Sequence, residues 1–122
     1  MVLGGESLRC IIVDDSPEFR TVAAVLLRRG GIAVVGGASN STEALRQVAE
    51  LTPDVAIVDV HLGEESGFVL ADQLHQHDTT VILISSYSAD DFVDMLPTSS
   101  AVGFLSKSDL SAAAVEQLLA DG

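Results

Sequence analysis

Short aliphatic runs, each about the length of one β-strand, recur along this chain and limit its possible folds more than any other feature. These runs are rich in branched side chains and lie at residues 8–13, 32–35, 54–58, 80–84 and 101–105. Most of them are apolar throughout rather than alternating, which predicts strands covered on both faces. Amphipathic stretches separate the runs, so the pattern predicts a parallel sheet with helices on either side.

Five helices are expected in the intervening stretches. Ser16-Pro17-Glu18 signals the first helix, and Gly30-Gly31 ends it. Its apolar residues recur at helical spacing and predict one stripe that faces the sheet: Phe19, Val22, Ala23, Leu26 and Leu27. The fourth expected helix, Tyr87 to Leu96, is short, acidic and stopped by Pro97. The 122 residues fit one domain (1–122, core about 8–119), with no output domain expected in the chain.

Composition excludes several classes of function. The formal net charge of −12 argues against direct nucleic-acid binding, because phosphates would be repelled. The apolar runs are far shorter than the ~20 residues that span a bilayer, so no membrane insertion is expected. The start of the chain lacks the pattern of a secretory signal. A single cysteine, Cys10, cannot form an internal disulfide and fits a reducing compartment, so we expect a cytoplasmic protein.

Polar residues follow the aliphatic runs in four places. Asp14 and Asp15 follow the first run, Asp59 the third, Ser85 the fourth, and Lys107, the only lysine, comes soon after the fifth. In open parallel sheets, ligands bind at the carboxyl ends of the strands. The sequence therefore predicts that these side chains meet in one site.

The predicted set suits phosphoryl transfer. Three neighbouring carboxylates repel one another, and a divalent cation such as Mg²⁺ removes that penalty. An ammonium and a hydroxyl can hold phosphoryl oxygens, while a carboxylate can act as the nucleophile. Ordinary structural roles remain open for each residue by itself: a helix cap for Asp14 or Asp15, a turn for Asp59 or Ser85, and a solvated strand end for Lys107. Their joint occurrence favours a shared site.

At this level the chain resembles the receiver domain of bacterial two-component response regulators. The resemblance spans about residues 8–119 and depends on the order and spacing of these segments: Ile11-Ile12-Val13-Asp14-Asp15, Pro53 to Asp59, Gly67, Val81 to Ser85 and Gly103-Phe104-Leu105-Ser106-Lys107. It implies an α/β, flavodoxin-like, doubly wound five-stranded parallel sheet of order 2-1-3-4-5 with five helices.

The resemblance also implies roles for individual residues. Asp59 would accept a phosphoryl group from a phosphohistidine on a sensor histidine kinase or a phosphotransfer protein. Mg²⁺ would be held by Asp14, Asp15, Asp59 and the backbone carbonyl of His61. Ser85 and Lys107 would bind phosphoryl oxygens, and Phe104 would be the aromatic switch.

Phosphorylation would then bias a surface formed by the fourth helix, fifth strand and fifth helix. That surface would act on a downstream protein target or a detached output domain, and a homodimer is left open. Two positions depart from the family pattern: Ser108 replaces a common proline after the lysine, and Leu62-Gly63 replaces one after the acceptor. In both positions the chain resembles receivers that precede helix-turn-helix output domains.

Two other functions compete with this interpretation. The first is a receiver-like protein-binding module that acts without phosphorylation. The second is a phosphatase with an aspartyl nucleophile, which generally needs a second acid where this chain has His61. The complete set of polar residues favours the phosphoacceptor, with at most slow self-catalysed phosphorylation and dephosphorylation and no other enzymatic activity.

Overall fold

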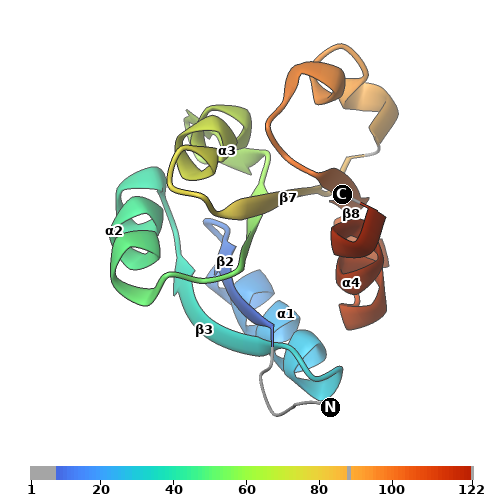
Figure 1. Ribbon diagram of the computed structural model, residues 1–122. Coiled ribbons are helices and arrows are strands. Elements are labelled where there is room, and N and C mark those ends of the chain that lie inside the picture. The colour runs from blue at the N-terminus through green and yellow to red at the C-terminus, as the bar shows by residue number, and fades with distance from the viewer. Residues whose placement is uncertain (1–7, 88, 122) are drawn as a thin grey trace.

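The computed structural model describes residues 8–87 and 89–121, which form a sheet of five parallel strands (Figure 1). These strands are β2 (Arg9–Val13), β3 (Ala33–Ala38), β4 (Val55–Asp59), β7 (Thr80–Ser85) and β8 (Gly103–Ser106). Their order across the sheet is β3-β2-β4-β7-β8. Counted along the chain this is 2-1-3-4-5, so the predicted doubly wound, flavodoxin-like fold class is confirmed.

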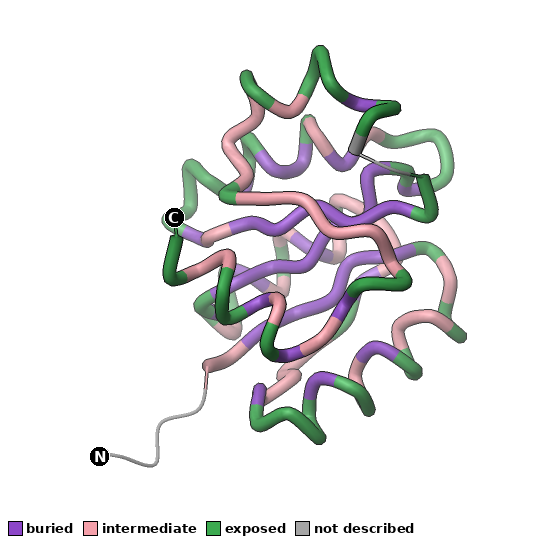
Figure 2. Tube along the Cα trace, turned by 90° about the vertical axis from the view of Figure 1, so that its right-hand side faces the viewer, coloured by how far each residue is buried: buried purple, intermediate pink, exposed green. Residues whose placement is uncertain are grey.

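Four α-helices cover the two faces of the sheet within the described residues. They are α1 (Pro17–Arg29), α2 (Ser41–Leu51), α3 (Gly67–His75) and α4 (Ala112–Asp121). Helices α2 and α3 lie on one face, and α1 and α4 lie on the other (Figure 1). Each face has its own apolar cluster. The consecutive β2 residues Ile11 and Ile12 point to opposite faces and belong to different clusters. Strand β4 is therefore buried along its whole length and β7 from its second residue on, and Figure 2 shows the buried strands in the middle of the molecule.

The apolar stripe predicted for α1 is partly wrong. Ala23 and Leu27 are buried as expected, but Val22 is 63% exposed and Leu26 is 39% exposed. The helix is rotated so that the line through Ala23 and Leu27 faces the sheet, with Phe19 packed at its edge. Periodicity identifies a broad apolar arc, and the contact with the sheet decides which part of that arc is buried.

The helix predicted at Tyr87 to Leu96 does not form as an α-helix. Two short 3₁₀ turns, η1 (Ala89–Phe92) and η2 (Leu96–Thr98), occupy this part of the chain. Asp90, Asp91 and Asp94 place like charges within one or two turns of each other, and Pro97 cannot continue a helix. The described residues thus contain four α-helices where five were predicted.

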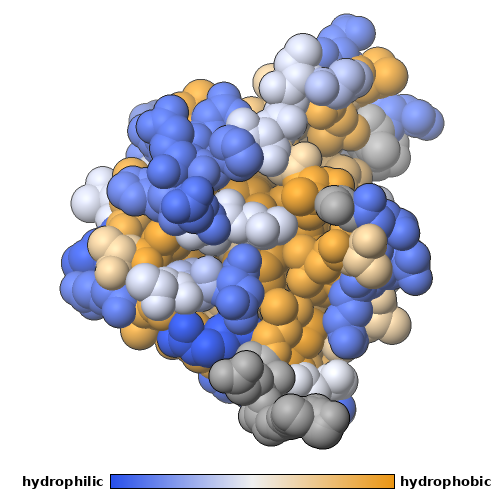
Figure 3. All heavy atoms as spheres, in the orientation of Figure 1, coloured by the Kyte–Doolittle hydropathy of each residue, from blue (hydrophilic) through white to orange (hydrophobic). Residues whose placement is uncertain are grey.

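The exterior is mixed in polarity. Figure 3 shows apolar atoms in the middle of one face, between more hydrophilic surfaces. No described helix has both the length and the apolar character needed to cross a membrane. Two short antiparallel strands, β5 (His61–Leu62) and β6 (Glu65–Ser66), were not predicted and lie between β4 and α3.

Candidate functional site

The predicted site residues lie together at the carboxyl edge of the sheet. Asp14 follows β2, Asp59 ends β4, and Ser85 ends β7. Lys107 opens a 3₁₀ turn, η3 (Lys107–Asp109), directly after β8. The ammonium nitrogen of Lys107 lies 2.8 Å from Asp14 Oδ2 and 3.0 Å from Asp59 Oδ2. Segments far apart in the sequence therefore meet at one ammonium group.

Three carboxylates form the acidic part of this cluster. Ligand oxygens of Asp14, Asp15 and Asp59 all lie within 4.8 Å of one another. Asp14 is fully buried and Asp59 is 6% exposed, whereas Asp15 is open to solvent. Three formal negative charges against the single positive charge of Lys107 leave a charge of −2. A divalent cation with oxygen ligands would balance that charge, and the exposed Asp15 would give it access from solvent.

Asp14 is held in place through its backbone and its side chain. Its Oδ1 accepts a 2.8 Å hydrogen bond from the backbone N–H of Ser16, and its own N–H donates to Ala38 O. The guanidinium of Arg20 donates to the Asp14 carbonyl oxygen. The cap of α1 is Ser16 rather than Asp14 or Asp15, since Ser16 Oγ accepts from Phe19 N–H. Neither aspartate is used as the helix cap.

Asp59 and Lys107 influence each other's protonation. Burial raises the pKa of the Asp59 carboxyl, while the His61 N–H at Oδ1 (3.0 Å) and the Lys107 ammonium partly oppose that rise. Burial by itself would lower the pKa of Lys107, but hydrogen bonds to Asp14 and Asp59 outweigh it, and the net effect is a raised pKa. Lys107 therefore stays charged, and the carboxylates around it carry an energetic cost of desolvation.

A glycine brings α3 against the end of the acceptor strand. A Cβ atom at Gly67 would lie 2.1 Å from the carbonyl oxygen of Asp59 and 2.8 Å from Val60 Cα. The Gly67 N–H donates a 2.7 Å hydrogen bond to Val60 O. Only a residue without a side chain permits this approach, so Gly67 fixes the backbone that carries Asp59.

A cavity of about 300 Å³ opens beside Asp59. Its lining is mostly polar and comes from the loops after β2, β4 and β7: Asp15, Asp59, His61, Gly63, Ser85, Ser86 and Tyr87. Ser85 is buried, and its Oγ accepts a 3.0 Å hydrogen bond from Tyr87 N–H. His61 lines this cavity, whereas His75 and His77 are exposed at the far end of α3. The space is open to a small anion and to a cation held by carboxylates.

Aromatic residues connect the site to the β8 edge of the sheet. Phe104 is half-buried, and its ring centroid lies 5.7 Å from that of Phe92. Phe92 in turn lies 5.9 Å from both His61 and Phe68. These contacts were not predicted from the sequence.

Phe19 is a site residue that sequence reasoning assigned only to the core. Lys107 Nζ lies 4.3 Å from the centroid of the Phe19 ring, a distance typical of a cation–π contact. The two residues are distant in the sequence, and an aromatic residue in an apolar stripe is the usual pattern of a core position. The sequence carries no signal that would pair them.

Comparisons with known proteins agree with this architecture. Residues 10–118 match the response regulator receiver domain family. A protein-glutamate methylesterase/protein-glutamine glutaminase of Hahella chejuensis is 38% identical over 85 residues, which cover 68% of this chain and 24% of that protein. The chain spans less than half of the length of the first curated relatives that it matches.

Two solved structures illustrate the similarity. The receiver domain described as that of a response regulator NarL from Mycobacterium tuberculosis has 29% identity and a TM-score of 0.80, with 96% of each chain covered. A Burkholderia pseudomallei response regulator, solved with a phosphorylated aspartic acid, a calcium ion and citrate, has 25% identity and a TM-score of 0.78. That match covers 93% of this chain and 66% of the other. The chain thus belongs to the response regulator receiver domain family of two-component systems.

Proposed function

We propose that this receiver domain is a phosphoacceptor and that Asp59 takes the phosphoryl group from a phosphohistidine on a sensor histidine kinase or a phosphotransfer protein. The observation that carries the proposal is the placement of the Asp59 carboxylate, 3.0 Å from the only lysine and beside a polar cavity. A carboxylate oxygen would form the new P–O bond as the P–N bond of the donor breaks. The electrons of the P–N bond return to the imidazole ring.

The residues around Asp59 have separate tasks in this proposal. Bound Mg²⁺ would neutralise charge on the phosphoryl oxygens, and Asp14, Asp15, Asp59 and the His61 backbone carbonyl would hold it. The charge of −2 left by the three carboxylates and Lys107 supports a divalent ion. The Lys107 ammonium would move from the carboxylates to a phosphoryl oxygen, and Ser85 Oγ would donate to another.

The response to phosphorylation would pass from Ser85 to Phe104. Strands β7 and β8 are paired, with Leu83 opposite Phe104 and Ser85 opposite Ser106. A shift of the Ser85 hydroxyl towards the phosphoryl group would open space into which the Phe104 ring turns. The affected surface would comprise η1, η2, β8 and α4, because the predicted fourth helix is replaced by the two 3₁₀ turns. Its partner would be a downstream protein or an output domain.

The acceptor assignment can be tested by intact mass. We expect incubation with Mg²⁺ and acetyl phosphate to add one phosphoryl group to the protein, and Asp59→Asn to abolish the addition. Asp54→Asn is the matched control because Asp54 lies just before the opposite end of β4 and bonds Arg9 N–H. That control should label normally. Labelling of Asp59→Asn at the wild-type level would refute the assignment. If neither the wild type nor any variant were labelled, the result would favour a binding module that acts without phosphorylation.

A further inference from the structure

One segment of this acidic chain has the opposite charge. Between Phe19 and Thr42 there are three arginines and no acidic residue, although the whole chain carries a net charge of −12. The segment covers most of α1, all of β3 and the turn between them. A local excess of positive charge is therefore concentrated on one edge of the molecule.

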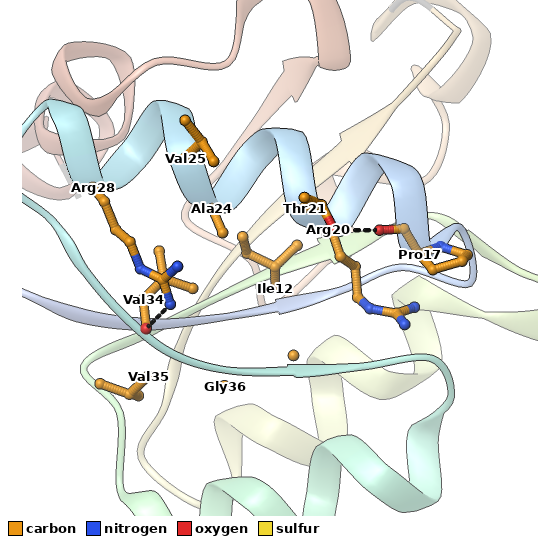
Figure 4. Close-up of a pocket in the computed structure, with 11 residues that line it drawn as sticks. Ile12, Pro17, Arg20, Thr21, Ala24, Val25, Arg28, Val34, Val35 and Gly36 are labelled. Carbon is orange, nitrogen blue, oxygen red and sulfur yellow. Dashed lines mark hydrogen bonds between the residues drawn. The ribbon is translucent and has the colours of Figure 1, made fainter.

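The structure forms a groove between α1 and β3, which we call the α1–β3 groove. It has a volume of about 430 Å³, and none of its lining residues is shared with the cavity beside Asp59. Arg20 and Arg28 lie towards opposite ends of the groove, with Ala24 and Ile12 between them and Val25 and Val34 nearer to Arg28 (Figure 4). Val25 is 43% exposed, so this apolar strip is open to a partner.

Both arginines are held in place by backbone carbonyls. Arg20 is near enough to Glu43 to contribute, after the hydrogen bonds from Ser39, to the lowered pKa of that carboxyl, but it forms no close ion pair with it. Arg28 donates a 2.9 Å hydrogen bond to Val34 O, and Arg20 donates to Asp14 O. Each guanidinium has five N–H donors, so most of its capacity remains. Within the described part of the chain, neither groove arginine lies at ion-pair distance from a carboxylate. Anchored, unpaired guanidiniums bind carboxylates at a small cost in side-chain entropy.

Side chains already occupy two backbone acceptors of the edge strand β3. The carbonyls of Val34 and Gly37 in β3 already accept hydrogen bonds from the side chains of Arg28 and Gln47. A partner would therefore bind through its side chains, lying in the groove rather than extending the sheet. Gly37 has no side chain to occupy the groove, and a Cβ atom there would lie 3.4 Å from Arg20 Cδ.

We propose that the α1–β3 groove binds an extended acidic segment of another protein. Eight residues of helix separate Arg20 from Arg28, a rise of about 12 Å. Two residues four apart in an extended chain are separated by about 13 Å. The segment would place carboxylates at positions i and i+4 on the two arginines and lay an aliphatic side chain on the strip between them. This site is independent of phosphoryl transfer at Asp59.

The test uses the unphosphorylated ¹⁵N-labelled protein and three short peptides. The probe is acetyl-ETVTE-amide, whose two Glu side chains and central Val share one face of an extended chain. The controls are acetyl-EETVT-amide, with the acids adjacent, and acetyl-QTVTQ-amide, without charge. We expect the probe to shift the amide signals of Ala24, Val25 and Val34, and the controls to bind more weakly. Arg20→Gln and Arg28→Gln should each weaken binding about two- to fivefold, as for one exposed ion pair. Arg46→Gln, the same change on α2 at the other face, should leave binding unchanged.

Several results would overturn the proposal. These are no shift with the probe, equal binding of the uncharged peptide, or equal weakening by Arg46→Gln. Sedimentation velocity that showed self-association, lost in Arg28→Gln, would assign the groove to a second copy of this chain instead. A short single-stranded oligonucleotide that displaced the probe and shifted the same amides would assign the groove to nucleic acid. If Arg20→Gln fails to fold because it loses the bond to Asp14 O, Arg28→Gln carries the test by itself.

Discussion

The chain places its positive charges in two different surroundings. Lys107 is 19% exposed and contacts two buried carboxylates at the carboxyl edge of the sheet. Arg20 and Arg28 lie at the α1–β3 groove, where they bond backbone carbonyls and form no ion pair with a carboxylate of residues 8–87 or 89–121. The first arrangement is desolvated, so each charge depends strongly on its neighbours. The second is nearer to water, since Arg28 is exposed and Arg20 only partly buried. Ion pairs there contribute little to stability, and charge remains available for a partner.

Burial therefore decides what a charge does in this molecule. At the candidate acceptor site, losing the Lys107 ammonium leaves two buried carboxylates without their counter-charge. At the groove, Arg28 is exposed, so losing its charge leaves no buried charge without a partner. Substitutions at the two places should differ in size, and these differences can be measured.

The largest difference is expected between Lys107→Ala and Arg28→Ala. Without divalent cations, Lys107→Ala should lower the free energy of unfolding by about 3 kcal/mol, because Asp14 and Asp59 lose their counter-charge. Arg28→Ala should change it by about 0.5 kcal/mol or less. Urea titrations followed by circular dichroism would measure both, and added Mg²⁺ should recover part of the loss in Lys107→Ala. Equal losses in the two variants would break the comparison.

Two glycines give the next largest contrast. Gly67→Ala should lower the free energy of unfolding by about 2 kcal/mol, since its Cβ would overlap the Asp59 carbonyl oxygen at 2.1 Å. Gly37→Ala, in the groove, adds a Cβ whose nearest contact is an ordinary 3.4 Å, so its effect should stay within about 0.5 kcal/mol. Thermal and urea unfolding test this pair. A mild effect of Gly67→Ala would show that the end of β4 can shift.

The raised pKa of Asp59 predicts the direction in which the free energy of unfolding changes with pH. Its pKa is raised in the folded state, mainly by burial, so the folded protein binds this proton more tightly than the unfolded chain. Without metal, stability should therefore fall as the pH rises from about 4 through the folded pKa. Asp59→Asn should remove this dependence and be more stable at neutral pH by on the order of 1 kcal/mol. The measurement is the variant-minus-wild-type difference in unfolding free energy across the pH range.

The exposed Asp90→Asn provides the control for that series, and we expect it to follow the wild type. A difference between Asp59→Asn and wild type that does not vary with pH would contradict the burial argument.

The smallest effect is expected at Phe19. Phe19→Leu should cost about 1 kcal/mol, from the lost cation–π contact and some packing, whereas Phe19→Tyr keeps the ring face and should cost less. Because Lys107 is the only lysine, lysine-specific isotope labelling gives the NMR signals of one lysine side chain. The nearby Phe19 ring should shift these signals upfield. The shift should be lost in Phe19→Leu and retained in Phe19→Tyr. An identical lysine spectrum in all three proteins would rule out the contact.

Much of this architecture could be predicted because it depends on local pattern. Continuous apolar runs such as residues 55–58 can be buried only in a sheet covered on both faces, and all four residues are fully buried. The parallel order then brings Asp14, Asp59, Ser85 and Lys107 to one edge, because each follows or ends a strand. The short helix at Tyr87 to Leu96 failed because a weak local preference was overridden by like charges and Pro97.

What the sequence pattern determined is thus the parallel sheet and the edge at which the reactive residues gather, while the order of the strands was implied by the family resemblance. The tertiary structure alone decided the rotation of α1, which exposes Val22, and the contact of Phe19 with an ammonium 88 positions away in the chain. It also decided that Arg20 and Arg28 bond backbone carbonyls at the α1–β3 groove. These features depend on how separate elements pack, and packing is set by distances between residues that no local pattern records.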